Sequence, residues 1–225
     1  MEQGAQPFDF GRKVDPKTFE ERIQKGYEVD PSKYLKEGWE IFKSRAGEFI
    51  VFTVIIFAIT IVLSKLDVIG SLALTLITPP LYAGFIIVVF MLLRQQEVQF
   101  KDFFKGFNYF LPLVLASIVS GILVTLGFIL LIIPGVYLIV SYLFVSMLIV
   151  EHHMEFWQAM ETSRQIVTKN WFSVFVFVLM LTAINLVGAL ALGIGLLVTI
   201  PLSACLVCVA YREIVGLQGN AELNA

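Results

Sequence analysis

Two clusters of residues in this chain carry side chains that can bind metals or take part in redox chemistry. Cys205 and Cys208 lie one helical turn apart in the last apolar stretch, and His152-His153 stand beside Glu151. A redox or metal pair needs a partner base or further ligands and access to water, which the last stretch does not offer. Adjacent helical residues point about 100° apart, and the chain has no other histidine. We therefore expect no metal and no cofactor, with buried apolar cysteines and a polar turn at the histidines.

Asn185 is the one strongly polar side chain well inside the long apolar stretches. Ionisable residues cost about 2.5–3.5 kcal/mol at the centre of a membrane helix and usually mark ion or proton pathways. None occurs between residues 106 and 150 or between 170 and 211. An amide most often bonds to a neighbouring helix, for roughly 0.6 kcal/mol on average. We predict such a polar membrane contact for Asn185, with a substrate role as the alternative. Since no catalytic set of residues is recognisable, we predict no enzyme.

The composition is that of a membrane protein. Of the 225 residues, 58% are hydrophobic and 15% are charged, whereas soluble domains have about 45–50% apolar and about 25% charged residues. The net charge is −2, without a basic block. Composition thus excludes a water-soluble enzyme, a nucleic-acid binder and a disulfide scaffold.

The apolar stretches predict an all-α integral membrane protein with six transmembrane helices. The first two are Phe49 to Leu63 and Val68 to Leu93. Two longer stretches each hold two crossings of about 20 residues. We expect the stretch 110–150 to divide near Gly127 and the stretch 172–211 to divide near Gly193, because glycine favours tight turns.

Basic residues predict the orientation of these helices. Every Lys and Arg except Lys65 falls on one side of the six-helix topology. The positive-inside rule places that side and both termini in the cytoplasm, so we expect a multi-pass protein of a bacterial inner membrane. Residues 1–33 then form a cytoplasmic arm without a signal peptide, with a short helix near Lys17 to Gln24. Residues 34–215 form the membrane domain, and residues 216–225 form a cytoplasmic tail.

A pattern occurs three times in the membrane domain, over about residues 34–94, 100–150 and 156–215. Each unit begins with apolar residues at the spacing of an amphipathic helix and continues into a membrane helix. It then turns near a glycine and returns through a helix with proline in its first part: Pro79, Pro80, Pro134 and Pro201. We predict three hairpins, each preceded by an interfacial helix. The prolines either end a short re-entrant segment or kink the helix.

Aromatic side chains are favoured at the membrane interface, and basic amphipathic helices lie there stably. We therefore predict six interfacial anchors: Trp39, Phe103, Phe104, Phe107, Trp157 and Trp171. The alternative is that these amphipathic segments are cytoplasmic helices packed on protein.

Three segments resemble a known family. They are PGVYLIVSYLFVSMLIVEHHMEFWQAMETSRQIVTKNWFSVF, YLKEGWEIFKSRAGEF and FKDFFKGFNYF. Over about residues 33–215 the chain resembles a group of prokaryotic polytopic membrane proteins of unknown function. These are similar to the membrane domain attached to some bacterial glycerophosphoryl diester phosphodiesterases. The resemblance implies a fold and a membrane location but no chemistry, and we expect no hydrolase domain in this chain.

Small residues predict close helix approach, which serves either an oligomer interface or contacts within one chain. Gly188, Ala191 and Gly195 lie on the fifth membrane helix and its turn, and Ser117 and Gly121 lie on the third. We expect a non-catalytic scaffold, assembly or accessory subunit of a membrane complex. Its expected partners are membrane lipids and either another protein or further copies of itself, but not nucleic acid. The alternative is a transporter or lipid-handling protein for a neutral or lipid-like substrate.

Overall fold

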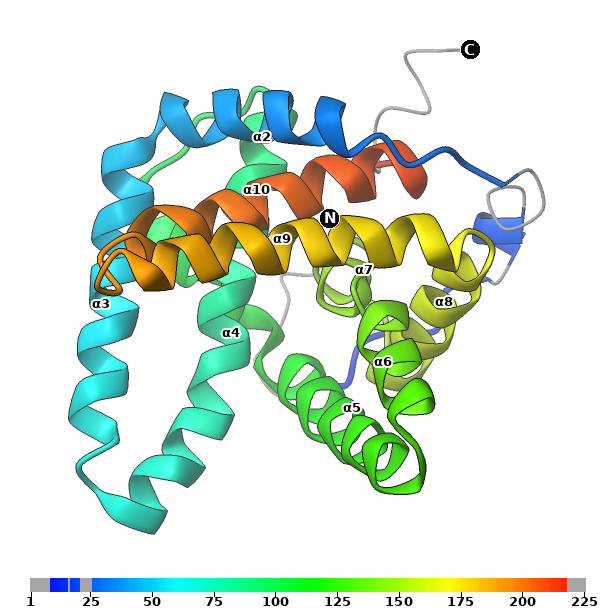
Figure 1. The fold of residues 1–225 in the computed structure, drawn as a ribbon, viewed down its shortest axis with the longest axis horizontal. Coiled ribbons are helices and arrows are strands. Elements are labelled where there is room, and N and C mark those ends of the chain that lie inside the picture. Colours follow the sequence, from blue (N-terminus) through cyan, green and yellow to red (C-terminus); the bar gives the residue numbers. More distant parts are fainter. Residues whose placement is uncertain (1–8, 16, 21–25, 218–225) are drawn as a thin grey trace. The chain divides into compact units, whose positions relative to one another are not determined.

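The computed structural model describes residues 9–15, 17–20 and 26–217. The described chain is helical apart from its connections and one isolated β-bridge, between Arg12 and Met154. Its named helices (Figure 1) are α2 (Pro31–Ser44), α3 (Ala46–Leu63), α4 (Asp67–Leu93), the 3₁₀ helix η1 (Phe100–Tyr109), α5 (Phe110–Leu130), α6 (Ile132–Ser141), α7 (Val145–His152), α8 (Phe156–Thr168), α9 (Trp171–Leu190) and α10 (Leu196–Ile214).

Six helical stretches of the described chain are long and apolar enough to cross a membrane. They are Ala46–Leu63, Asp67–Leu93, Phe100–Leu130, Ile132–His152, Trp171–Leu190 and Leu196–Ile214. The prediction of an all-helical, multi-pass membrane protein with six spans is thereby confirmed. Residues 17–20 of the short helix expected in the arm are helical, and the rest of that helix lies outside the described residues.

The break after the third span falls at Leu131, not at Gly127 itself. Gly127 lies inside α5, where a Cβ atom would come within 2.9 Å of the Gly135 nitrogen of α6. The glycine thus allows α5 and α6 to pack closely, while Leu131 makes the turn with an extended backbone (φ −163°, ψ 150°).

The fourth span is interrupted between α6 and α7, which the sequence did not predict. Ser163 of α8 supplies the hydrogen bonds that the interruption removes. Its hydroxyl donates to the Ser141 carbonyl oxygen over 2.7 Å and accepts the Phe144 amide over 3.2 Å. Because Ser163 is fully buried, the broken turn is satisfied by protein and not by water.

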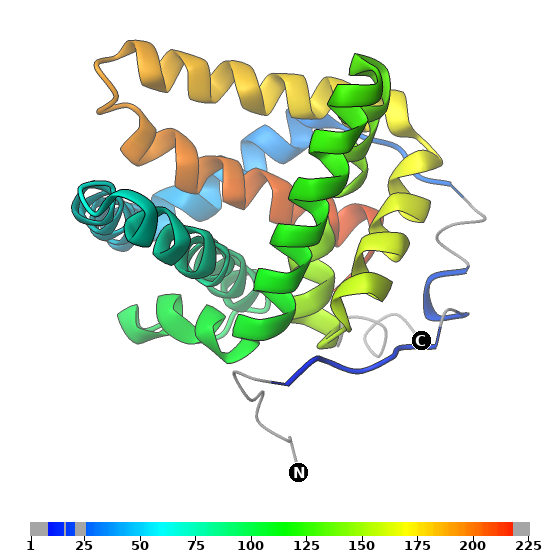
Figure 2. The same cartoon turned by 90° about the horizontal axis from the view of Figure 1, so that it is seen from below.

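The described residues form two compact units. The first contains residues up to 29, residues 108–176 and residues from 211 onward; the second contains residues 30–107 and 177–210. In the first unit, α8 lies along α5, α6 and α7 (Figure 2). The apolar stripe of α8 is therefore buried inside its own unit, through Ala159, Met160, Ile166 and Val167.

The second unit has an aromatic core. Phe49 and Phe52 of α3, Phe85 of α4 and Phe103 of η1 are all fully buried. The ring centroids of Phe52 and Phe103 are 4.7 Å apart, and those of Phe52 and Phe85 are 5.0 Å apart. Ring pairs at such distances stabilise a core beyond their buried area.

Two glycines let η1 lie directly on α4. A Cβ atom at Gly84 would overlap the carbonyl oxygen of Phe103, and one at Gly106 would overlap that of Pro80. Each helix thus presents a glycine to the backbone of the other, and this fit places Phe103 in the aromatic core.

In the same unit, α2 packs on α10, where a Cβ atom at Gly38 would lie 2.7 Å from a Leu206 side-chain carbon. The parts of α9 and α10 that belong to this unit lie side by side and run across the direction of α3 and α4 (Figure 1).

The close contact between η1 and α4 predicts that alanine destabilises the protein at some glycines and not at others. We expect Gly84→Ala and Gly106→Ala each to destabilise the protein by about 1–3 kcal/mol, because the overlapped atoms belong to the backbone. Gly47→Ala in α3 is the matched control, since a Cβ atom there meets nothing within 4 Å and alanine favours a helix. The free energy of unfolding in detergent micelles measures the effect. Equal stability of all three variants would contradict the close fit.

Candidate functional site

A polar seam joins α9 and α10 within the second unit. The Asn185 side-chain amide donates to the Ser203 hydroxyl over 2.7 Å and to the Leu181 carbonyl oxygen over 2.9 Å. Ser203 in turn donates to the Thr199 carbonyl oxygen over 2.7 Å. The structure thus places Asn185 in a hydrogen-bonded contact between two apolar helices.

Small residues bring the two helices together at this seam. A Cβ atom at Gly188 would lie 2.5 Å from the Thr199 hydroxyl oxygen and 3.1 Å from the Gly195 carbonyl carbon. Gly188 and Gly195 therefore serve a contact within one chain. Ala191 is exposed, and a Cβ atom at Gly121 of α5 would meet nothing within 4 Å.

Two polar atoms of the seam are buried and have no hydrogen-bond partner among the described residues. They are the Asn185 carbonyl oxygen Oδ1 and the Thr199 hydroxyl oxygen. Buried polar atoms without partners are uncommon in folded proteins and call for an explanation. Chemically, Oδ1 can accept a hydrogen bond from one further group.

The predicted anchors fall in different environments. Trp39 of α2 and Trp157 of α8 are 41% and 56% exposed, and Phe104 is exposed as well. Phe107 and Trp171 are half-buried, with Trp171 stacked 5.1 Å from Phe175. Phe103 is fully buried in the aromatic core, so its side chain supports the fold from within.

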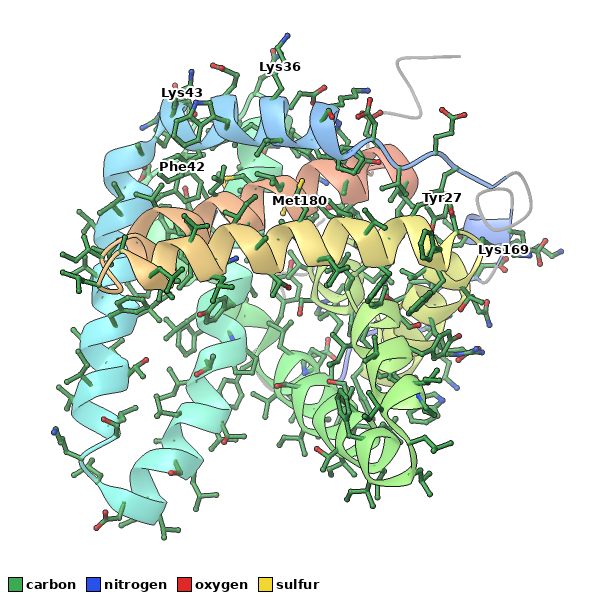
Figure 3. All side chains as sticks on the ribbon, viewed as in Figure 1. Tyr27, Lys36, Phe42, Lys43, Lys169 and Met180 are labelled. Atoms are coloured by element: carbon green, nitrogen blue, oxygen red, sulfur yellow. The ribbon has the colours of Figure 1, made fainter. Side chains whose placement is uncertain are left out.

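The outer face of α2 combines an exposed tryptophan with basic residues. Lys43 lies 6.0 Å from the centre of the Trp39 ring and 2.8 Å from Glu40. Figure 3 shows Lys36 and Lys43 pointing away from the side of α2 that carries the buried Phe42. We call Leu35, Lys36, Trp39, Glu40 and Lys43 the α2 outer face.

The outer face of α8 has a similar character. We define it by Trp157, Glu161, Arg164 and Gln165, which follow one another at helical spacing. Arg164 pairs with Glu161 over 2.6 Å, and this pairing lowers the pKa of the Glu161 carboxyl. A charged pair and an exposed indole thus lie opposite the buried stripe of the same helix.

The prolines do not interrupt the helices that contain them. Pro79 and Pro80 lie inside α4 and Pro201 lies inside α10, while Pro134 is the third residue of α6. Pro134 has no helical hydrogen bond to lose in the first turn, whereas the others each remove one.

The histidines lie next to the N-terminal arm. The His152 ring is buried 5.0 Å from the Phe19 ring. His153 approaches the Asp9 carboxylate over 3.1 Å, and this hydrogen bond lowers the Asp9 pKa. Cys205 and Cys208 are both buried, and neither forms a disulfide. Within the described part of the chain, no group of three or more His, Cys, Asp or Glu residues could hold a metal ion.

The chain matches no protein-family model, no curated protein and no solved structure.

The polar seam predicts a small and specific loss of stability. We expect Asn185→Leu to lower the free energy of unfolding by about 1 kcal/mol, because it removes an interhelical hydrogen bond. Thr182→Leu is the matched control: it lies one turn earlier on α9, is exposed, and bonds only to the Val178 carbonyl of its own helix. Unfolding in detergent micelles is the measurement. A loss of equal size in both variants would show that the seam contributes nothing particular.

Proposed function

We propose that this protein is a non-catalytic integral membrane protein that acts as a scaffold, assembly factor or accessory subunit of a membrane complex. The observation that supports the proposal is that α2 and α8 are amphipathic helices whose outer faces remain exposed. Each buries its apolar stripe within its own unit, and each still exposes a tryptophan together with charged residues.

The outer faces suit contacts at the water boundary of a membrane. Tryptophan and arginine are enriched at protein interfaces, and tryptophan is also favoured at headgroup depth. Because neither outer face is needed to cover its own unit, both are available to a protein partner, a second copy or lipid headgroups. We propose a protein partner in the same membrane as the main occupant, with lipids around it.

For the membrane arrangement, we propose three hairpins with both termini in the cytoplasm of a bacterial cell. The distribution of basic residues, of which only Lys65 lies in a predicted periplasmic turn, supports this orientation. The resemblance to prokaryotic polytopic membrane proteins supports the same location and leads us to propose membership of that family.

A transporter or lipid-handling protein is the second candidate, and the polar seam is what favours it. The unpartnered oxygens of Asn185 and Thr199 offer hydrogen bonding to a neutral or lipid-like substrate. In reconstituted vesicles, loss of uptake or lipid transfer in Asn185→Leu, with stability close to that of Thr182→Leu, would favour this second function over the first.

The proposed topology predicts which positions a membrane-impermeant thiol reagent can reach. In a background without Cys205 and Cys208, we expect Ser64→Cys, Leu131→Cys and Leu192→Cys to react from the periplasm. We expect Gln96→Cys and Gln165→Cys to react only after the cytoplasm is opened. All five positions are exposed, so accessibility differs only through the membrane. Labelling of any one position from the opposite side would contradict the arrangement.

The proposed function predicts that substitutions on the outer faces of α2 and α8 weaken a native complex. We expect the double variant Lys36→Ala, Trp39→Ala and the single variant Trp157→Ala each to reduce co-purifying partner severalfold at matched expression. Val62→Ala is the control, because Val62 of α3 is an apolar side chain that is more exposed (64%) than Trp39 or Trp157 and lies outside both outer faces. Quantitative mass spectrometry of the purified complex is the measurement. Unchanged partner levels in both test variants would argue against the scaffold function.

A further inference from the structure

Residues 9–15 of the arm attach to the junction between α7 and α8 through one isolated β-bridge and side-chain hydrogen bonds. The Arg12 amide donates to the His153 carbonyl oxygen over 2.8 Å, and the Glu155 amide donates to the Arg12 carbonyl oxygen over 3.0 Å. These two bonds make the parallel β-bridge between Arg12 and Met154. Both segments belong to the first unit.

The junction leaves backbone carbonyl groups that need hydrogen-bond partners from outside α7. The last carbonyl groups of a helix have no partner within that helix, and α7 ends with His153 in the left-handed region (φ 50°). Arg12 reaches two of the carbonyl groups exposed there. Its backbone amide bonds to His153, and its side-chain Nε donates to the His152 carbonyl oxygen over 3.1 Å.

A side-chain amide of α8 extends the pairing by two residues. The Val14 amide donates to Gln158 Oε1 over 2.8 Å, and Gln158 Nε2 donates back to the Val14 carbonyl oxygen. Gln158 thus presents one acceptor and one donor to the arm, as the next residue of a strand would. The Asp9 carboxylate adds a contact to His153 at the other end.

Gly11 is the position where the fit depends on the residue type. Its φ of 84° is in the left-handed region, which favours glycine. A Cβ atom there would also come within 2.8 Å of the Met154 carbonyl carbon and oxygen. Any other residue would push the arm away from the junction.

Residues 9–15 are held by polar bonds with little apolar burial, whereas Phe19, further along the arm, is buried against the His152 ring. Gly11 and Val14 are half-buried, and the other residues from 9 to 15 are exposed, including Phe10 at 59%. Backbone hydrogen bonds contribute modestly to stability because water competes for both partners. Such a segment can detach without unfolding the helices beneath it.

A second attachment keeps a detached arm close to the junction. The Tyr27 hydroxyl donates to the Ile166 carbonyl oxygen over 3.0 Å, and the Asn170 side chain donates to the Tyr27 carbonyl oxygen over 3.1 Å. Because this point lies at the end of α8, the tether keeps the local concentration of the arm high.

We infer that the α7–α8 junction is a binding site for an extended peptide, and that residues 9–15 are its reversible intramolecular ligand. The site recognises a strand by backbone hydrogen bonding, with glycine facing Met154 and arginine at the next position. The arm therefore shields the junction from any other extended segment. The inference is independent of the proposed scaffold function, since it concerns contacts within one chain.

Hydrogen exchange at the Glu155 amide tests this in nanodiscs that hold one copy of the chain. We expect Gly11→Ala to accelerate exchange at this amide at least tenfold. Gly26→Ala is the matched control, because Gly26 also has a positive φ (69°) but a Cβ atom there meets nothing within 4 Å. Unchanged protection in Gly11→Ala, or equal acceleration in the control, would overturn the assignment.

A peptide added in trans tests whether residues 9–15 act as a ligand or as a fixed part of the fold. A chain lacking residues 1–15 should lose protection at Glu155, and an excess of a peptide of residues 9–15 should restore it. The same peptide with Gly11→Ala should restore at least tenfold less. Protection that survives the deletion, or that the peptide does not restore, would overturn the proposal. So would protection of the full chain only in discs with two copies, because the arm would then bind a neighbour.

Discussion

Backbone groups at a helix break inside an apolar chain must find hydrogen-bond partners in the protein, and this requirement explains how the described helices are connected. In a membrane no water is available to such groups. Ser163 of α8 bonds to both sides of the break between α6 and α7. At the end of α7, which the proposed topology places at the cytoplasmic water boundary, the arm bonds to the carbonyl groups in place of water. The break between α6 and α7 and the end of α7 are thus each satisfied by a segment distant in sequence, and these bonds hold the first unit together in addition to apolar packing.

The apolar spans could be predicted from the sequence, whereas the helix breaks and their hydrogen-bond partners could not. Long apolar stretches located α3, α4, α9 and α10 to within a few residues, because length and composition alone define a span. The interruption before α7 depends on one serine in another helix, which no local pattern reveals. The 3₁₀ form of η1 was also missed, since the spacing of its phenylalanines suits an amphipathic α-helix. The two glycines that seat η1 on α4 became meaningful only with the neighbour in place.

For the candidate sites, periodicity identified the amphipathic helices but not what their apolar sides contact. Met160 and Val167 of α8 face protein and are buried, so a stripe at helical spacing does not by itself show that a helix lies on a membrane. Trp157, on the other side of α8, is the exposed feature. Among the six predicted anchors, Phe103 and Phe104 are neighbours in sequence, yet Phe103 is fully buried and Phe104 is 39% exposed. Asn185 was recognisable because an amide is conspicuous in an apolar helix, whereas its partner Ser203 resembled the other hydroxyls.

The arm changes how the cytoplasmic surface of the proposed topology is understood. A polar, proline- and glycine-containing segment is typical of a solvated tail, but residues 9–15 are attached through backbone groups, which leave little trace in composition. A partner that requires either the arm or the junction must compete with the bond between them. Its apparent affinity is its intrinsic affinity multiplied by the fraction of chains in which the arm is detached. Weak polar attachment near a tether at Tyr27 therefore suits regulation better than support, because it holds the junction covered while leaving the helices beneath it unchanged on release.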